Sequence, residues 1–559
     1  MRLTRIVISV LLAGMLSIPA MASSDWVDDF LHRFDPKPGS SPSQPANAPQ
    51  ANLAQLLRTG EVPITLNDVI NAMIDNNLAI RTDRFAPRSS YLQSLVFYQA
   101  LIPSLRLTAN VGRNVALSTT QLNGATLNIQ NTGFLDANVA QLLPTGTSFS
   151  VDMAMNRLQT SSNNSIFNPS YTGRLTYTVG QHLLQNRGRI VNMNQILQAQ
   201  NTEKISEATL ELQLSTLMVQ AQNSYWDLVF AEQDLAVKQR SMERAQIELD
   251  QDKTKVEIGT LAPVDVVQTE GQVANVSDQL VQSQSAITIA GDQLKKLVSA
   301  DKDPSIFALK LRALQTPLRP EAVEIPALEA AVRIALENRP EMRQAMLDLR
   351  NKDLQVNFMN NQKLPLFDVT GQYIQNGTGG TQRRGFLLGT APLNPAVPGG
   401  VFDALGQLFS YGYNGFSAGF NVVIPLNNKS VNAAYDRAVN DQHMSQSTID
   451  TTAQQIALDV RNALTQVGLY RSRIDKAKTV RELAQRVLDA EQEKFNLGTS
   501  TLRFVLDSQN NLAQAQSNEV QVLVNFTKAV VALDQAMGMT LKKNNVEISK
   551  MVSSGPAAR

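Results

Sequence analysis

Apolar residues recur at alternating spacings of four and three along two long stretches of the chain. In the first stretch, residues 195–258, the seam consists of Leu214, Met218, Ala221, Tyr225, Leu228 and Leu235. In the second stretch it consists of Ile456, Val460, Ala463, Val467, Tyr470, Ile474 and Ala477. This spacing is typical of coiled-coil helices. Because neither stretch contains a proline, we expect two very long helices, the first about 95 Å long at 1.5 Å per residue.

Other segments alternate apolar and polar residues, which is the period of a β-strand. The alternating segments are residues 105–117, 149–156, 175–179, 367–373 and 416–424. Each predicted strand would have one apolar and one polar face. Such strands suit either a soluble sheet with one buried face or a transmembrane barrel with lipid outside and water within.

Two glycine-containing runs lie among the predicted strands. Leu142-Leu143-Pro144-Thr145-Gly146-Thr147 is a strong turn signal and predicts an additional hairpin between residues 118 and 171. The run Asn376-Gly377-Thr378-Gly379-Gly380 lacks the strand-to-helix setting of a phosphate-binding loop. We expect this second run to be the loop of another hairpin.

The order of elements is repeated within the chain. Leu66, Asn76, Arg81 and Pro103 match Leu328, Asn338, Arg343 and Pro365 at one constant interval. A second constant interval relates Lys255, Gly259, Thr260 and Val266 to Lys494, Gly498, Thr499 and Val505. Because an internal repeat decides architecture, we predict a first repeat at 63–300 and a second at 326–541. Each would contain a helix, two extended segments and a long helical hairpin, and a linker or equatorial segment at 301–325 would join them.

The first residues have the pattern of an export signal. Arg2 and Arg5 are followed by an apolar core, and Ala20-Met21-Ala22 is a small-residue cleavage site. We therefore predict a signal peptide at 1–22. A flexible leader rich in proline and serine is expected at 23–62 and a C-terminal tail at 542–559. Ordered structure would begin with a helix over 64–81, at the cap-like Thr65-Leu66-Asn67-Asp68.

The amino-acid composition argues against most common classes of enzyme active site. The 559 residues include no cysteine and only three histidines, which lie far apart in the sequence. We can assemble no nucleophile, base and orienting group from the remaining residues, so we predict no enzymatic activity, no cofactor and no metal site. The net charge of +1 argues against a nucleic-acid partner. Without a cysteine after the signal, we expect that the exported chain is not a lipoprotein.

Contact with a membrane would have to be made by strands. Beyond the signal, no stretch approaches the roughly 20 uninterrupted apolar residues of a spanning helix. The few strands of one chain cannot close a barrel, and an open sheet edge in lipid would leave backbone groups unpaired. The membrane interpretation therefore requires several chains to share one barrel.

With these features the chain resembles the TolC-like outer-membrane efflux proteins over about residues 63–541. The resemblance rests on the duplicated order of elements, on Leu336-Glu337-Asn338-Arg339-Pro340-Glu341, and on Lys494-Phe495-Asn496-Leu497-Gly498-Thr499-Ser500 followed by Val505-Leu506-Asp507. Members of this family are homotrimers. The resemblance implies an α+β membrane protein in which four strands from each chain form one twelve-stranded outer-membrane barrel. That barrel would be continuous with a long periplasmic α-helical coiled-coil barrel.

The resemblance also assigns roles to the turns of the two helical hairpins. In the family these tips meet a periplasmic adaptor protein, and the implied contact residues are Gly259, Thr260, Leu261, Gly498, Thr499 and Ser500. The entrance is narrowed just beyond the tips, and the implied gate residues are Asp265, Phe495, Arg503, Phe504 and Asp507. We place Asp265 and Asp507 at matching positions, where three copies would concentrate cations. Arg503 and Phe504 depart from the family pattern, and Phe504 would instead supply an apolar constriction.

The resulting expectation is a passive channel in the outer membrane with a periplasmic extension. It would be the exit duct of a tripartite efflux or type I secretion system, surrounded by outer-membrane lipid. Its partners would be a periplasmic adaptor and an inner-membrane transporter, and the hairpins would untwist around Gly259 and Gly498 to open it. The alternative is a soluble periplasmic coiled-coil scaffold, whose strands form a soluble sheet and which has no channel activity.

Overall fold

The computed structural model describes residues 61–119, 126–162, 165–299, 304–382 and 399–546. Within these ranges the chain forms two compact units, each built from separate stretches of sequence. Unit 1 comprises residues 92–200 and 351–442, and unit 2 comprises residues 61–91, 201–350 and 443–546. The predicted signal peptide at 1–22, nearly all of the predicted leader and most of the predicted tail lie outside the described residues.

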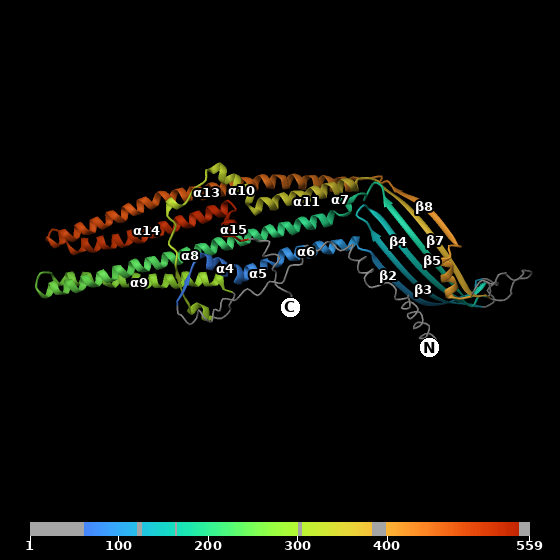
Figure 1. The fold of residues 1–559 in the computed structure, drawn as a ribbon, viewed down its shortest axis with the longest axis horizontal. Coiled ribbons are helices and arrows are strands. Elements are labelled where there is room, and N and C mark those ends of the chain that lie inside the picture. Colours follow the sequence, from blue (N-terminus) through green and yellow to red (C-terminus); the bar gives the residue numbers. More distant parts are fainter. Residues whose placement is uncertain (1–60, 120–125, 163–164, 300–303, 383–398, 547–559) are drawn as a thin grey trace, which may run out of the picture. The chain divides into compact units, whose positions relative to one another are not determined.

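Unit 1 contains one antiparallel sheet (Figure 1). Over the described residues its six strands, in spatial order, are β2 (Ser104–Leu117), β3 (Leu127–Leu142), β4 (Thr147–Thr160), β5 (Phe167–His182), β7 (Leu366–Gln382) and β8 (Asn414–Val423). The five segments with strand periodicity are thus confirmed as strands. The expectation of four strands per chain is wrong, because β3 and β4 form the additional hairpin that the turn signal predicted. Its turn has Gly146 at φ +87°, and the Leu143 N–H donates to the Thr147 carbonyl (2.8 Å).

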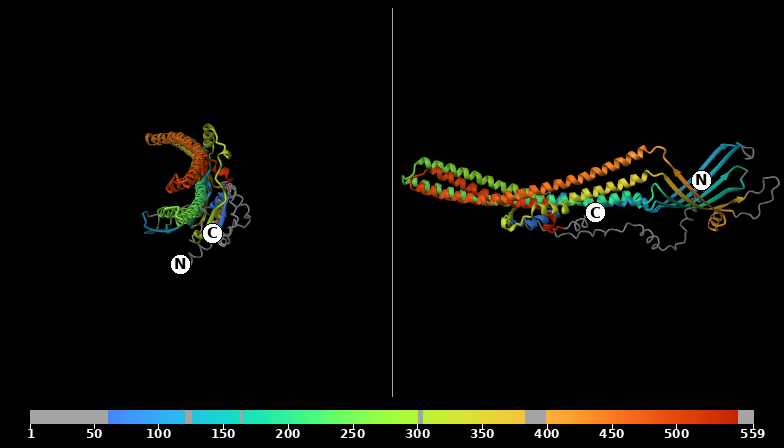
Figure 2. Two further views of the ribbon diagram at one scale, coloured as in Figure 1. Left: turned by 90° about the vertical axis from the view of Figure 1, so that its left-hand side faces the viewer. Right: turned by 90° about the horizontal axis from the view of Figure 1, so that it is seen from above.

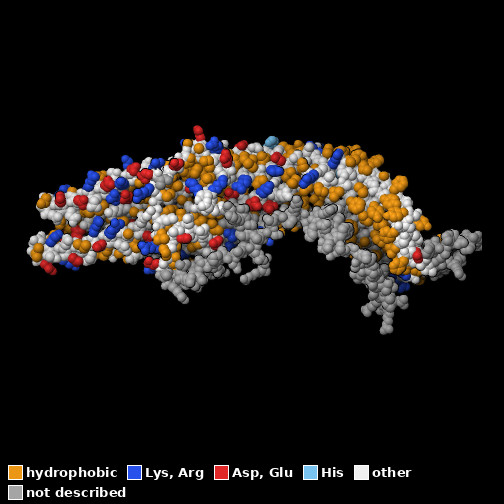
Figure 3. All heavy atoms as spheres, viewed as in Figure 1, with side chains coloured by type: hydrophobic (Ala, Val, Ile, Leu, Met, Phe, Trp, Pro, Cys, Tyr) orange, Lys and Arg blue, Asp and Glu red, His pale blue; other side chains and the backbone are white. Residues whose placement is uncertain are grey.

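The two faces of this sheet differ in polarity on every strand. One cross-strand row on the apolar face consists of Leu105, Val139, Val151, Tyr177, Tyr373 and Phe416. The neighbouring row on the opposite face consists of Ser104, Ala140, Ser150, Thr178, Gln372 and Ser417. Figure 3 shows apolar side chains gathered over the strands. Much of the apolar face is open to solvent in the single chain, with Val111 80% exposed and Phe416 88% exposed.

Helix α12 (Val401–Phe409) packs on the apolar face of β5 and β7. A Cβ atom on Gly377 would lie 2.0 Å from the Ala404 carbonyl oxygen, and one on Gly379 would lie 2.2 Å from the Gly400 carbonyl oxygen. The prediction that residues 376–380 form a hairpin loop is therefore wrong. These residues continue β7, and the glycines are needed because the helix backbone approaches so closely.

Unit 2 is built mainly from two long helical hairpins. The first is formed by α8 (Asn194–Glu257) and α9 (Pro263–Val298), and the second by α13 (Lys429–Asn496) and α14 (Leu502–Ala536). Figure 2 shows that the hairpins lie side by side in this unit, and hydrogen bonds such as Gln272 to Asn510 (2.7 Å) join α9 to α14. Both long helices predicted from the coiled-coil seams are confirmed. No helix in the described ranges is both long and apolar enough to cross a membrane.

Several shorter helices are also present among the described residues. They are α4 (Leu66–Asn76), α5 (Leu78–Asp83), α6 (Phe85–Tyr98), α7 (Arg189–Asn192), α10 (Leu328–Asn338), α11 (Pro340–Gln362) and α15 (Thr540–Lys543), with the 3-10 turn η1 (Gln99–Leu101). The Thr65 side chain caps α4 in a reciprocal capping box with Asp68, as the sequence indicated. The helix predicted to run to residue 81 is interrupted, because the Asn77 side chain accepts hydrogen bonds from the Ala79 and Ile80 N–H groups and starts α5.

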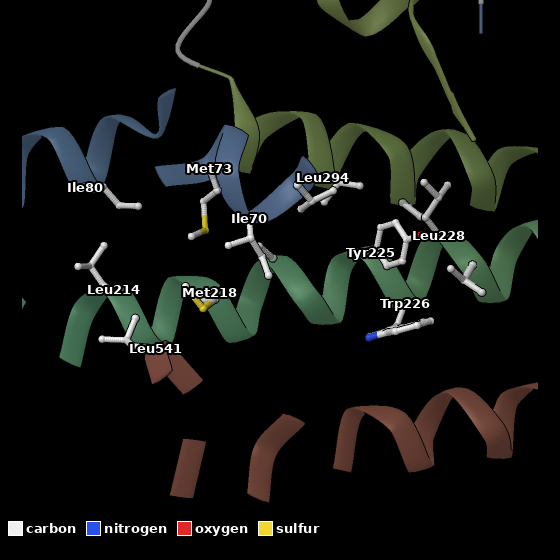
Figure 4. Close-up of a cluster of buried hydrophobic side chains, with 14 of the residues drawn as sticks. Ile70, Met73, Ile80, Leu214, Met218, Tyr225, Trp226, Leu228, Leu294 and Leu541 are labelled. Atoms are coloured by element: carbon white, nitrogen blue, oxygen red, sulfur yellow. The ribbon is translucent and has the colours of Figure 1, made fainter. Parts of the chain in front are cut away.

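The predicted seams are buried in two separate cores of unit 2. Around α8, Leu214, Met218 and Tyr225 pack against Met73 of α4 and Leu294 of α9 (Figure 4). Around α13, the buried residues are Ile456, Val460 and Val467, which pack with Ala331 and Ala335 of α10 and Phe526 of α14. Each long helix therefore buries its seam against its own short helix and hairpin partner.

A short parallel pair of strands also belongs to unit 2. Strand β1 (Glu61–Ile64) pairs with β6 (Lys310–Ala313). The assignment of Glu61 and Val62 to a flexible leader is therefore wrong, since both are paired and Val62 is buried. Segment 301–325, predicted as a linker, contains β6 and the 3-10 turns η3 (Pro304–Ala308) and η4 (Pro320–Ala322).

Candidate functional site

The two helical hairpins turn at glycines that share one geometry. Gly259 follows α8 with φ +76°, and Gly498 follows α13 with φ +74°. In the first turn, Gly259 N–H donates to the Val256 carbonyl (3.0 Å) and Thr260 N–H to the Lys255 carbonyl (2.8 Å). The second turn repeats these bonds, from Gly498 to Phe495 and from Thr499 to Lys494, both at 2.9 Å. This is the Schellman arrangement, in which a left-handed residue ends the helix.

The glycines are required by conformation and not by space. Among the described residues, nothing lies within 4 Å of where a Cβ atom would stand on Gly259 or Gly498. The threonine that follows each glycine donates its side-chain hydroxyl to the same carbonyl as its N–H, at 3.0 Å for Thr260 and 3.1 Å for Thr499. In the second turn Ser500 also donates to Glu491 (2.8 Å). The predicted helix ends at both glycines are confirmed.

The first residues after the tips correct one pairing made from the sequence. The Asp265 N–H donates to the Ala262 carbonyl (3.0 Å) at the start of α9, and the Phe504 N–H donates to the Thr501 carbonyl (3.1 Å) at the start of α14. Asp265 is therefore equivalent to Phe504. The placement of Asp265 and Asp507 at matching positions is wrong, because Asp507 lies nearly one helical turn further along α14.

The other proposed gate residues fall into exposed and packed groups. Arg503 and Asp507 are largely exposed and face one another one turn apart, with Nε 3.9 Å from Oδ2. Phe504 is exposed beside them. Phe495 is instead packed within its hairpin against Val505, and the Lys255 ammonium of the first hairpin lies 5.4 Å from its ring centroid. This contact brings the two tips together.

Two exposed apolar residues at the tips were missed by the sequence analysis. Ile258 is 69% exposed and Leu497 is 79% exposed, and each directly precedes the turn glycine. The signal that could have found them is their position, since an apolar side chain beyond the last packed turn has no partner within its own hairpin. Together with the glycines and threonines, they give both tips a similar surface.

Partly buried polar groups join the hairpins behind the tips, and these too were missed. The Asp234 carboxylate of α8 accepts hydrogen bonds from Ser283 of α9 (3.1 Å) and Ser517 of α14 (2.5 Å). Gln272 and Asn510 exchange two hydrogen bonds between α9 and α14. The sequence signal was the abundance of uncharged polar residues beside the seams, but their partners lie on separate helices.

Two acidic residues of α8 lie close to the tips in partly desolvated surroundings. The Asp252 side chain is 0% exposed and accepts hydrogen bonds from Thr269 (2.8 Å) and Lys255 (3.1 Å). Glu248 accepts a hydrogen bond from Gln509 of α14 (2.5 Å). Burial raises the pKa of Glu248, aided by the charge of Asp252, while the bond from Gln509 opposes the shift. Within the described part of the chain, no group of three or more histidine, aspartate or glutamate side chains is arranged to hold a metal ion.

The sequence is similar to those of known outer-membrane proteins. The chain is 22% identical over 358 residues to Outer membrane protein TolC of Escherichia coli (strain K12), covering 63% of this chain and 68% of TolC. It is 21% identical over 318 residues to Nodulation protein T of Rhizobium leguminosarum bv. trifolii, covering 56% of this chain and 62% of that protein, which is less than two thirds of its length. Residues 331–539 match the family model described as outer membrane efflux protein.

These matches confirm the resemblance to the TolC-like outer membrane efflux proteins. The chain also shares its fold with solved outer-membrane channels. The Campylobacter jejuni CmeC outer membrane channel superposes with a TM-score of 0.59 over 88% of this chain and 89% of that chain, at 14% identity. At this low identity the likeness concerns the fold, which in these TolC-like structures combines helices with a sheet.

Proposed function

We propose that three copies of this chain form a passive outer-membrane channel, the exit duct of a tripartite efflux or type I secretion system. The strands of unit 1 would share one β-barrel, and the long helices would line a duct in the periplasm. The match of residues 331–539 to the outer membrane efflux protein model supports this function, as does the name Outer membrane protein TolC carried by one relative. The repeats at 63–300 and 326–541 would have arisen by duplication, a proposal supported by the equal turns at Gly259 and Gly498.

The observation that carries the proposal is the polarity of the sheet. Its apolar face exposes large side chains such as Leu105, Val111 and Phe420, whereas the opposite face is mainly polar. A water-soluble scaffold would have to cover this apolar face with another element. A barrel with lipid outside and water inside leaves both faces in the solvent that suits them.

The tips would receive the adaptor and close the duct. Gly259, Thr260, Leu261, Gly498, Thr499 and Ser500 would form the adaptor surface, and we add Ile258 and Leu497 as its apolar anchors. Asp265, Arg503, Phe504 and Asp507 would line the closed entrance, and Phe495 would support it through its contact with Lys255. Untwisting of the hairpins would break bonds of the kind that Asp234 makes between α8, α9 and α14.

Membrane fractionation with a matched pair of variants tests the channel. We expect the chain in the outer-membrane fraction, as a trimer that dissociates only on heating, with a small conductance in planar bilayers. Phe420→Arg places a charge on the lipid face and should cost about 2–4 kcal/mol of insertion free energy near mid-membrane. Ser417→Arg, three residues away on the polar face, should leave the amount of inserted trimer unchanged.

The soluble scaffold predicts the opposite result. The chain would then be recovered from the periplasm without detergent, as a monomer or dimer, and would show no conductance. Equal loss of both arginine variants would also contradict a sheet with one lipid face.

For the tips, Ile258→Ser with Leu497→Ser should keep the trimer and its conductance but weaken adaptor capture. Unchanged capture would remove these residues from the adaptor surface.

A further inference from the structure

We propose that the shared barrel has eighteen strands, closed by seams between β8 of one copy and β2 of the next. This inference rests on the proposed trimer and goes beyond it. Three copies of the sheet, with six strands each in the described ranges, supply that number. The additional β3–β4 hairpin would therefore not lie outside the barrel wall. It would widen the wall of the channel.

The free edges of the sheet are suited to such seams. In the described part of the chain, β2 pairs only with β3 and β8 only with β7, so each has one unpaired edge. Since every neighbouring pair is antiparallel, β8 runs antiparallel to β2, and a second copy placed beside β8 continues the alternation. Transmembrane barrels of bacterial outer membranes use even numbers of antiparallel strands.

The apolar band on the sheet has the slope of a tilted barrel wall. Leu105 of β2 and Phe416 of β8 lie in one cross-strand row. From this row the apolar side chains on β2 continue toward Val111, whereas those on β8 continue in the opposite direction toward Val422. The band therefore crosses the rows diagonally through all the strands, which is expected when strands tilt by roughly 45° to the membrane normal. A hairpin outside the wall would not need to keep this band.

The same band predicts the register of the seam. Register is fixed by keeping apolar side chains on one face of a sheet. Aligning the apolar run 416–422 of β8 with the run 105–111 of β2, in antiparallel order, puts Phe416 opposite Val111 on the outer face. On the inner face this alignment puts Ser417 opposite Asn110.

Helix α12 accounts for the part of β7 that β8 does not cover. Strand β8 reaches only Gln375 of β7, although β7 continues to Gln382. Beyond that point the Gln407 side chain of α12 donates to the Thr378 carbonyl and accepts from the Thr378 N–H, both at 2.9 Å. At Thr378 the edge of β7 beyond β8 is thus hydrogen-bonded within the chain, and the seam needs only the length of β8.

A wider barrel follows from the strand count. Barrel diameter grows roughly in proportion to strand number, so eighteen strands give about 1.5 times the width of twelve and about twice the cross-section. The outer half of the duct would then admit bulkier polar cargo than a twelve-stranded barrel. The tips would remain the narrow part of the path.

Disulfide trapping tests the seam, since the natural chain contains no cysteine. In membranes, Ser417→Cys combined with Asn110→Cys should form a covalent dimer and trimer ladder on non-reducing gels, because opposed strand residues have Cα atoms within disulfide range. Arg106→Cys and Thr108→Cys, each combined with Ser417→Cys, test the neighbouring registers. The single variants and the pair Ser417→Cys with Thr176→Cys are controls, because Thr176 lies on the interior strand β5.

Excision of the additional hairpin tests the width. Residues 118–166 are replaced by Asn-Gly, which joins β2 directly to the antiparallel β5 with apolar positions kept on one face. We expect this variant to remain a trimer and to exclude, from the outer side in planar bilayers, neutral polymers that the full chain admits. Its barrel cross-section should be about half as large.

Each failure has a distinct meaning. A trimer in the outer membrane without any covalent ladder at the three registers, or with a polymer cut-off unchanged by excision, would overturn the eighteen-stranded barrel and leave the proposed channel standing. A fast-migrating monomer with an internal disulfide would show that β8 returns to its own β2, and would overturn it too. Absence of both trimer and outer-membrane location would instead reject the proposed function.

Discussion

At the scale of single residues, we predict that alanine substitutions change stability in opposite directions at the turn glycines, Gly259 and Gly498, and at two glycines inside the long helices. Alanine at either position must adopt a positive φ, so we expect Gly259→Ala and Gly498→Ala each to destabilise the protein by about 1–2 kcal/mol. Gly271 and Gly468 lie inside α9 and α13 with no described atom within 4 Å of an added Cβ. Alanine there should stabilise by about 0.5–1 kcal/mol. Thermal unfolding in detergent measures all four, and shifts of one common sign would contradict this account.

Local conformation explains which residues the sequence could reveal. The turn glycines were predictable because the end of a helix requires a left-handed residue whatever surrounds it. The equivalence of Asp265 with Phe504 was missed because the pairing with Asp507 matched residue types and not helix positions. Ile258 and Leu497 were missed because an apolar residue at the end of a seam cannot be told from core by spacing alone.

At the scale of elements, a second prediction concerns the packing of α12 against β7. Gly377→Val places a Cβ in contact with the Ala404 carbonyl, so the helix must move away and leave Thr378 without the Gln407 side chain. We expect a loss of about 1–3 kcal/mol, as for other overpacked sites. Gly371→Val on the same face of β7 is the control, because no described atom lies within 4 Å there. Unfolding temperature and protease cleavage of α12 provide the measurements. Equal effects of both variants would contradict close packing of α12 against Gly377.

The contact between α8 and α14 predicts a dependence on pH. The raised pKa of Glu248 means that the folded protein holds this proton more tightly than the unfolded chain. Its contribution to stability is therefore present at low pH and is lost as pH rises through the raised pKa, above the ordinary value of 4.5. When the pH is lowered from 7 to 5, the unfolding temperature should therefore rise more in the natural chain than in Glu248→Gln. Parallel pH profiles of the two proteins would contradict this role.

The elements themselves were largely predictable, and the exceptions have physical causes. The long helices and five strands have clear periods of apolar residues. Strand β3 lacked a clear period because Asn131, Gly133 and Gln141 interrupt its apolar face. The glycines of β7 indicated a loop because local chemistry cannot show that α12, more than twenty residues later, packs on them.

At the scale of the proposed trimer, the exposed pair Arg503 and Asp507 at the proposed entrance predicts ion selectivity. In the proposed trimer, Asp507→Ala would leave three unpaired arginines at the mouth and favour anions, and Arg503→Ala would leave three aspartates and favour cations. Because both side chains are largely exposed, neither change should alter stability by more than about 1 kcal/mol. Reversal potentials across a salt gradient measure the effect. Shifts of the same sign in both variants would place this pair outside the ion path.

The number of strands in the proposed barrel is the property that the sequence left most open. Periodicity gives each strand its two faces, but closure depends on edges that meet in another copy. The turn at Gly146 indicated an additional hairpin without showing whether that hairpin joins the wall. Only the register of β3 and β4 between β2 and β5 settles their place in the sheet.

The unpaired edges of β2 and β8 also have a consequence for the solubility of the chain before assembly. A newly exported copy would present two long strand edges and an apolar face to water, the combination from which aggregates grow. Pairing with the wrong neighbour would compete with pairing in the trimer, and the competition would sharpen as the local concentration of unassembled chains rises. Controlled delivery by holding chaperones would then matter as much to the yield of working channels as the stability of the finished structure.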